Sequence, residues 1–92
     1  MITQDEAARI VERVVGVPAD DESKGWTLEE FDRGWLVHEK AAVGIMGAGT
    51  RVVEKESGRV MNFRSNVPPR RIRTQYDAVL IDAFQEDPSP GN

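Results

Sequence analysis

The 92-residue chain contains no cysteine and only one histidine. Without cysteine there is no disulfide framework, no thiolate zinc site and no cysteine nucleophile. A single histidine, His38, cannot build a usual zinc site by itself. As a general base it would need an orienting carboxylate and a nucleophile, and the spacing of residues identifies neither. We therefore expect no bound metal, no cofactor and no enzymatic activity.

Long apolar runs are also missing. No segment of the chain approaches the roughly 20 apolar residues that a membrane helix needs. The first residues lack the basic start and the apolar core of a signal peptide. These absences predict a soluble cytoplasmic protein that does not bind membranes.

Acidic residues outnumber basic ones, and the formal net charge is -4. Binding of nucleic acid needs a surplus of lysine and arginine facing the phosphates, so we expect no nucleic-acid partner. A basic protein partner is compatible with this charge, because opposite charges accelerate encounter. The acidic candidates for such a contact lie in the first loop and the segment after it: Asp20, Asp21, Glu22, Glu29, Glu30 and Asp32.

The basic residues that are present include one cluster, formed by Arg64, Arg70, Arg71 and Arg73. Arginine pairs well with carboxylates and phosphates, so the cluster is a candidate for an anion or an acidic protein. Surfaces that bind single strands usually interleave aromatic residues, whereas Tyr76 belongs to an apolar stripe. We interpret the cluster as a solvated helix face.

The segment 2–15 is predicted to be a helix. Thr3 followed by Glu6 forms the pattern of a capping box, in which both side chains satisfy free amides of the first turn. Gly16 is placed to end the helix, and Pro18 prevents its continuation.

A second helix is predicted over 69–84. Proline suits the first turn of a helix, where a missing amide costs nothing. Apolar residues then recur at helical spacing: Ile72, Tyr76, Val79, Leu80 and Ala83. The polar segment 85–92 predicts a disordered tail after a single domain of residues 1–84.

Strands are predicted over 26–31, 34–40, 51–55 and 59–63. The last two form a hairpin in which Gly58 takes the left-handed position of the turn, and Glu54 and Glu56 are expected to keep the hairpin soluble. The segment 41–49 contains three glycines but lacks the following helix and the lysine of a phosphate loop, so we interpret it as a bend.

These elements predict an α+β fold with a single small domain. It would consist of an N-terminal helix, an antiparallel sheet of three to five strands and a C-terminal helix packed on the sheet, with one or both helices covering one face of the sheet. The side chains expected in the core are Ile10, Val14, Trp35, Val53, Ile72, Tyr76 and Leu80.

The order of motifs supports a family resemblance. Ile-Thr-x-x-Glu-Ala is followed by Gly-Trp-Leu-Val, Gly-Ala-Gly, Arg-Val-Val-Glu-Lys-Glu-Ser-Gly-Arg-Val and a Pro-Pro helix with a tyrosine. This order resembles the YrhB-type immunity-protein family of bacterial polymorphic toxin systems, over about residues 2–77. Thr50, Glu54 and Ser57 stand where that family commonly has Pro, Asp and Thr.

The resemblance implies a binding protein. Its expected role is to neutralise a cognate toxin domain through a stoichiometric complex, without catalysis. The hairpin motif also resembles PepSY-like domains, so the alternative function is a PepSY-like or cystatin-like regulatory module that restrains a peptidase. The sequence leaves the oligomeric state open.

Overall fold

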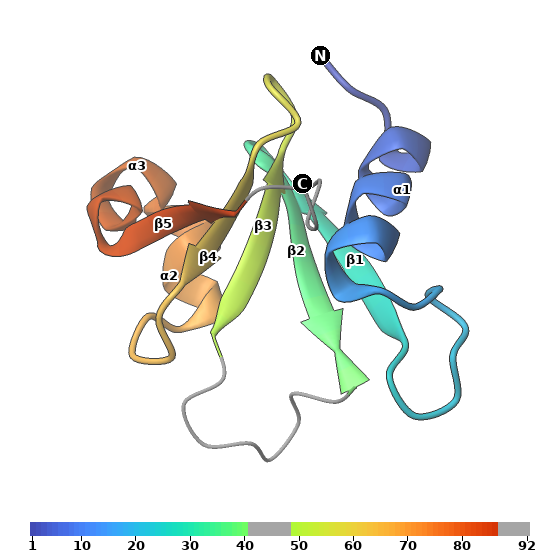
Figure 1. Cartoon of the computed structure of the whole chain (residues 1–92). Coiled ribbons are helices and arrows are strands. Elements are labelled where there is room, and N and C mark those ends of the chain that lie inside the picture. Colours follow the sequence, from blue (N-terminus) through green and yellow to red (C-terminus); the bar gives the residue numbers. More distant parts are fainter. Residues whose placement is uncertain (41–48, 87–92) are drawn as a thin grey trace.

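The computed structural model describes residues 1–40 and 49–86. It confirms the predicted α+β class and shows helices on both sides of an antiparallel sheet (Figure 1). Most of the predicted bend at 41–49 lies outside the described residues. In chain order the elements are α1 (Gln4–Val15), β1 (Trp26–Phe31), β2 (Gly34–Glu39), β3 (Thr50–Glu54), β4 (Val60–Phe63), α2 (Pro69–Thr74), α3 (Tyr76–Val79), the 3-10 helix η2 (Leu80–Asp82) and β5 (Ala83–Glu86).

The five strands form a meander, in which each strand pairs with the next one along the chain. The register aligns Leu36 of β2 with Val52 of β3, and Val52 with Met61 of β4. Successive side chains of a strand point to opposite faces, so this aligned row lies on one face and its neighbours lie on the other. Both faces carry apolar side chains, so each face must pack against another element to bury them.

One face is covered by α1. Ala7 and Val11 of this helix pack against a row of buried side chains from four strands: Trp26, Trp35, Val37, Val53 and Val60. The predicted capping box is confirmed, because the Thr3 hydroxyl accepts from the Glu6 amide at 3.2 Å and the Thr3 amide donates to the Glu6 carboxylate at 3.1 Å. The helix ends at Gly16, as predicted, in a left-handed conformation with φ 91°.

The other face is covered by α2 and α3, on the opposite side of the sheet from α1 (Figure 1). Ile72, Tyr76 and Val79 pack against the second row of buried side chains, which is formed by Leu36, Val52, Met61 and Phe63. Tyr76 also meets Phe63 with ring centroids 5.6 Å apart. The sheet is therefore the middle layer of a three-layer domain.

The prediction of one continuous helix over 69–84 is wrong. Helix α2 stops at Thr74, Gln75 has φ -135° and ψ 40°, and the chain resumes as the short α3 and η2. Residues 83–86 then leave the helical conformation and pair with β4. The apolar residues at the end of the predicted helix are compatible with a helix or a strand. Pairing with the open edge of β4 stabilises the strand.

This strand also alters the predicted tail. Gln85 and Glu86 were assigned to the tail, but they belong to β5. The remainder of the predicted tail, 87–92, lies outside the described residues. No helix in the described part of the chain is long and apolar enough to cross a membrane.

Four of the seven expected core residues are buried: Trp35, Val53, Ile72 and Tyr76. Ile10, Val14 and Leu80 are only partly buried and pack at the margins of the two apolar clusters. Gly58 has the predicted positive φ, 74°, in the turn of the β3–β4 hairpin. This turn lies against Ile2 and Ile10. The N-terminal end of α1 is thereby packed over this turn.

Candidate protein-binding surface

The acidic loop, residues 18–25, is fastened to the start of β1 at several points. The Trp26 indole Nε1 donates to the Val17 carbonyl at 3.0 Å, and the Trp26 amide donates to the Ala19 carbonyl at 3.2 Å. The Gly25 amide donates to the Asp21 carbonyl at 3.0 Å. The loop therefore presents its side chains from an ordered backbone.

Within this loop the three consecutive acids have different environments. The Asp21 carboxylate accepts from the Lys24 amide at 2.7 Å and from the Ser23 amide at 3.0 Å. These backbone hydrogen bonds lower the pKa of Asp21. Asp20 and Glu22 are exposed. Asp21 thus shapes the loop, while Asp20 and Glu22 face the solvent.

Glu29 and Glu30 are separated by the pleat of β1. Glu29 pairs with His38 at 2.7 Å and with Arg73 of α2 at 3.1 Å, on the face covered by α2 and α3. Glu30 pairs with the Lys55 ammonium at 2.8 Å, on the opposite face. The structure therefore does not bring these two carboxylates together, and both are partly neutralised by a neighbouring cation.

Asp32 lies in the exposed turn between β1 and β2. That turn is at the far end of β1 from the acidic loop, because the loop enters the strand at Trp26 and the turn follows Phe31. The six acidic candidates consequently form one group of three in the loop and three separate carboxylates along β1 and its turn.

His38 does have a carboxylate beside it, which the spacing in the sequence did not identify. The hydrogen bond to His38 is the main cause of the lowered pKa of Glu29. However, the two side chains are 44% and 42% exposed, so the pair is open to water. Within the described part, no hydroxyl group forms a hydrogen bond with the His38 ring. The arrangement therefore lacks the nucleophile of an acyl-transfer site.

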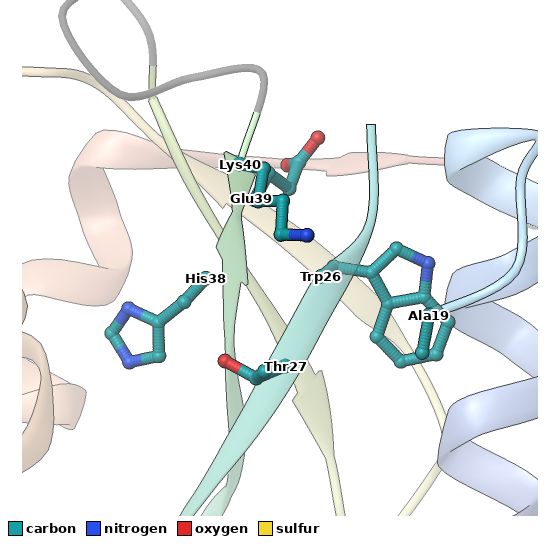
Figure 2. Close-up of a pocket in the computed structure, with 6 residues that line it drawn as sticks. All are labelled: Ala19, Trp26, Thr27, His38, Glu39 and Lys40. Atoms are coloured by element: carbon teal, nitrogen blue, oxygen red, sulfur yellow. The ribbon is translucent and has the colours of Figure 1, made fainter. Parts of the chain in front are cut away.

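A hollow lies beside the acidic loop at the start of β1. Figure 2 shows the Trp26 ring next to Ala19 on one side, His38 on the other, and Lys40 above Thr27. The polar ends of its walls are engaged elsewhere: Glu39 pairs with Arg51, and the Lys40 ammonium donates to the Glu22 carbonyl at 3.3 Å. The described lining presents a shallow surface feature with no assembled catalytic group.

The predicted basic cluster is dispersed among three surroundings. Arg73 binds Glu29, Arg71 donates to the Gln75 side chain at 3.2 Å, and Arg64 lies near β5. Arg70 is exposed on α2. The exposed Arg70 and Arg71 agree with the solvated helix face that the sequence favours, whereas Arg73 is paired with the sheet and Arg64 lies before α2.

Glu54 is the charged residue that sequence reasoning placed wrongly. It was expected to keep the hairpin soluble, but only 8% of it is exposed. Its carboxylate accepts from Tyr76 Oη at 2.6 Å, from Arg59 Nε and Nη2 at 2.9 Å each, and from Ser57 Oγ at 3.1 Å. The spacing Glu-x-x-Ser-x-Arg is visible in the sequence, whereas the tyrosine comes from a distant element.

The electrostatics of the cluster around Glu54 indicate that the cluster stabilises the fold. Burial raises the pKa of Glu54, but the hydrogen bonds from Arg59, Tyr76 and Ser57 outweigh it and leave the pKa lowered. Burial and the neighbouring carboxylate both raise the pKa of Tyr76. The tyrosine therefore stays a neutral donor to a charged acceptor, and every partner is used within the fold.

Two large apolar side chains are exposed near the C-terminal end of the described chain. Ile81 is 88% exposed and Phe84 is 55% exposed, and apart from Met1 they are the large exposed hydrophobic residues of the described part. We call them the β5 patch. Sequence reasoning missed it, because Phe84 was assigned to the end of a helix.

Metal chemistry finds no support in the described ranges. No group of three or more His, Cys, Asp or Glu side chains within 1–40 and 49–86 could hold a metal ion. Among the described residues, the acidic loop with its hollow and the β5 patch are exposed features that remain candidates for contact with a partner.

The described residues thus form a three-layer α+β domain with an exposed acidic loop and an exposed apolar patch. A family model described as the Immunity protein 35-like domain matches residues 5–82, so the chain belongs to that family. Comparisons with curated proteins and with solved structures gave no match. The immunity-protein part of the predicted resemblance is confirmed, and the match favours it over the PepSY-like alternative.

Proposed function

We propose that this protein neutralises one cognate bacterial toxin by forming a stoichiometric complex with the toxin domain. The observation that carries the proposal is the family match, which covers residues 5–82 and hence nearly the whole domain. The YrhB-type motif order is consistent with the same role. Masking a toxin needs a complementary surface and no catalysis, and the exposed carboxylates of Asp20 and Glu22 can form part of such a surface.

We further propose that the acidic loop steers this protein to a basic toxin surface. Asp20 and Glu22 would act as the outward charges, and Asp21 would hold the loop in shape. Asp32 would add an exposed carboxylate at the far end of β1, while Glu29 and Glu30 would contribute less because cations are paired with them. A toxin that cleaves nucleic acid needs a basic cleft to attract phosphate, and such a cleft is a suitable target for these carboxylates.

The direct test is co-expression with the toxin encoded next to the gene for this protein. We expect growth of the cells to be restored and the two proteins to co-purify as a complex of defined stoichiometry, measured by light scattering after gel filtration. A toxin that remains lethal and uncomplexed in the presence of this protein would contradict the proposal.

A second experiment addresses the contact surface. Reversal of Asp20, Asp21 and Glu22 to Lys should slow association, and the difference from the wild type should shrink as salt screens the charges. The double variant Asp20→Lys/Glu22→Lys isolates the outward charges from the residue that shapes the loop. Dissociation rates should change less, because peripheral charges act mainly on encounter.

The matched control reverses two exposed acids elsewhere, as Glu12→Lys/Glu56→Lys. Both double variants change the net charge by the same amount, so a loss confined to the loop variant assigns the effect to position and not to total charge. Equal association rates for the two double variants would remove the acidic loop from the contact surface and leave the proposed complex in place.

A further inference from the structure

The β5 patch combines a protruding side chain with an adjacent hollow. Phe84 protrudes from the face of the sheet that carries α1, since it is aligned with Asn62 of β4. The hollow is lined by Arg64, Asn66, Ile81, Asp82, Ala83 and Phe84. A surface with a knob and a hollow side by side can be complementary to a second copy of itself, because a two-fold axis places each knob over the other hollow.

The same residues lie on an open edge of the sheet. Strand β5 pairs only with β4, so its outer edge has no strand partner within the described residues. The edge sequence Ala-Phe-Gln-Glu contains no proline and no lysine, the residues that commonly protect an edge from pairing. Two copies joined antiparallel along β5 would form one continuous sheet and would bring both Phe84 side chains to the same face.

Charge also favours this edge for contact between two copies. Each copy carries a net charge of -4, so they must meet where the local charge is balanced. At β5, Arg64 and Asp82 line one hollow, and Glu86 is paired with Arg51 at 2.9 Å. The acidic loop lies beside β1, at the opposite edge of the sheet (Figure 1).

From these observations we infer that this protein self-associates through the β5 edge, with Phe84 and Ile81 of each copy packed into the patch of the other. A four-residue edge buries less surface than a standard stable interface, so the dimer is weak and depends on concentration. Both acidic loops remain at the outer ends of the dimer. The inference is independent of the proposed toxin complex.

The test measures the mass of the purified full-length protein by sedimentation velocity, from about 5 µM to about 1 mM, a range that brackets weak association. We expect the mean mass to rise toward that of a dimer at the upper end. Amide signals in NMR spectra recorded over the same range should shift in residues 81–86. A monomer at every concentration would overturn the inference.

Variants locate the interface. Phe84→Lys and Ile81→Lys should each weaken the association by about tenfold or more, because each places a charge in an apolar contact. Both side chains are largely exposed, so unchanged melting curves are expected and exclude unfolding as the cause. Thr27→Lys is the matched control, because it adds the same charge to an exposed position of the other edge strand.

Three results would overturn the assignment. The first is a dimer that persists in both β5 variants, and the second is a dimer that is lost in Thr27→Lys. The third is a wild type that stays monomeric while Phe84→Lys blocks binding of the neighbouring toxin, which would assign the patch to the toxin. Loss in the two β5 variants with retention in Thr27→Lys is the expected result.

Discussion

The hydroxyl of Tyr76 lies 2.6 Å from Oε2 of Glu54, and this hydrogen bond joins α3 to the last residue of β3. Arg59 of the same hairpin donates to both oxygens of this carboxylate, from Nε to Oε1 and from Nη2 to Oε2, each at 2.9 Å. Arg33 stacks over the Tyr76 ring, with its guanidinium carbon 5.3 Å from the ring centroid. The contact thus fixes the short C-terminal helices on the sheet.

The first prediction concerns Tyr76→Phe. This variant keeps the ring contacts but removes a donor from a buried carboxylate, so the free energy of unfolding should fall by about 1–3 kcal/mol. Urea denaturation followed by tryptophan fluorescence measures it. In a Glu54→Gln background the same change should cost less, because the charged acceptor is gone, and equal costs in the two backgrounds would contradict a coupled pair.

The second prediction concerns acid stability. The pKa of Glu54 is lowered from its ordinary value of 4.5, so its contribution is fully present above that pH. The contribution is lost as the pH falls through the lower, folded-state value, because protonation removes the charge that Arg59 binds. Denaturation midpoints should therefore fall less steeply with acid in Glu54→Gln than in the wild type.

The exposed Glu56 supplies the control for this experiment. Glu56→Gln removes the same formal charge from the same hairpin without touching the buried cluster. Its acid profile should follow that of the wild type, and a profile like that of Glu54→Gln would show that net charge and not the cluster sets the acid dependence.

The third prediction concerns Trp35, which is 3% exposed beneath α1. Trp35→Ala should lower the free energy of unfolding by about 3–5 kcal/mol, through lost burial and the cavity that remains. The Lys55 ammonium lies 5.7 Å from the ring centroid, and Lys55→Met should cost less than about 1 kcal/mol because its ion pair is near the surface. A thermal melt of Trp35→Ala equal to the wild type would remove Trp35 from the core.

The fourth prediction separates the roles of two neighbouring acids. Asp21→Ala removes the acceptor of the Ser23 and Lys24 amides and should loosen the loop, with faster amide exchange at these positions than in the wild type. Asp20→Ala should stay within about 0.5 kcal/mol of the wild type, as is usual for an exposed residue. Equal exchange rates in the two variants would contradict a shaping role for Asp21.

Local signals were sufficient to predict much of the fold. The Thr3–Glu6 pattern predicted the start of α1 because the capping box involves residues three apart. Gly16 and Gly58 predicted the helix end and the hairpin turn because both need positive φ. Each of these features depends on residues that are close in sequence, which is the range over which a single sequence is informative.

The features that sequence reasoning missed depend on distant partners. Glu54 is buried because Tyr76, 22 positions later, folds over it. Strand β5 forms because β4 has an open edge with which it can pair. No local sequence pattern predicts this pairing. The split of Glu29 from Glu30 could have been foreseen, because adjacent residues of a strand point to opposite faces. Their ion-pair partners, Arg73 and Lys55, could not.

The meander of the sheet has a consequence for how the chain folds. Every strand pairs with its neighbour in sequence, from β1 to β5, so no strand has to wait for a distant segment before it finds a partner. Closing the short connections between β1 and β2 and between β3 and β4 costs little entropy, and folds rich in local pairings reach the native state quickly for a β-containing protein. The sheet can grow one strand at a time as the chain leaves the ribosome, with the Tyr76–Glu54 contact formed only when the last helices emerge.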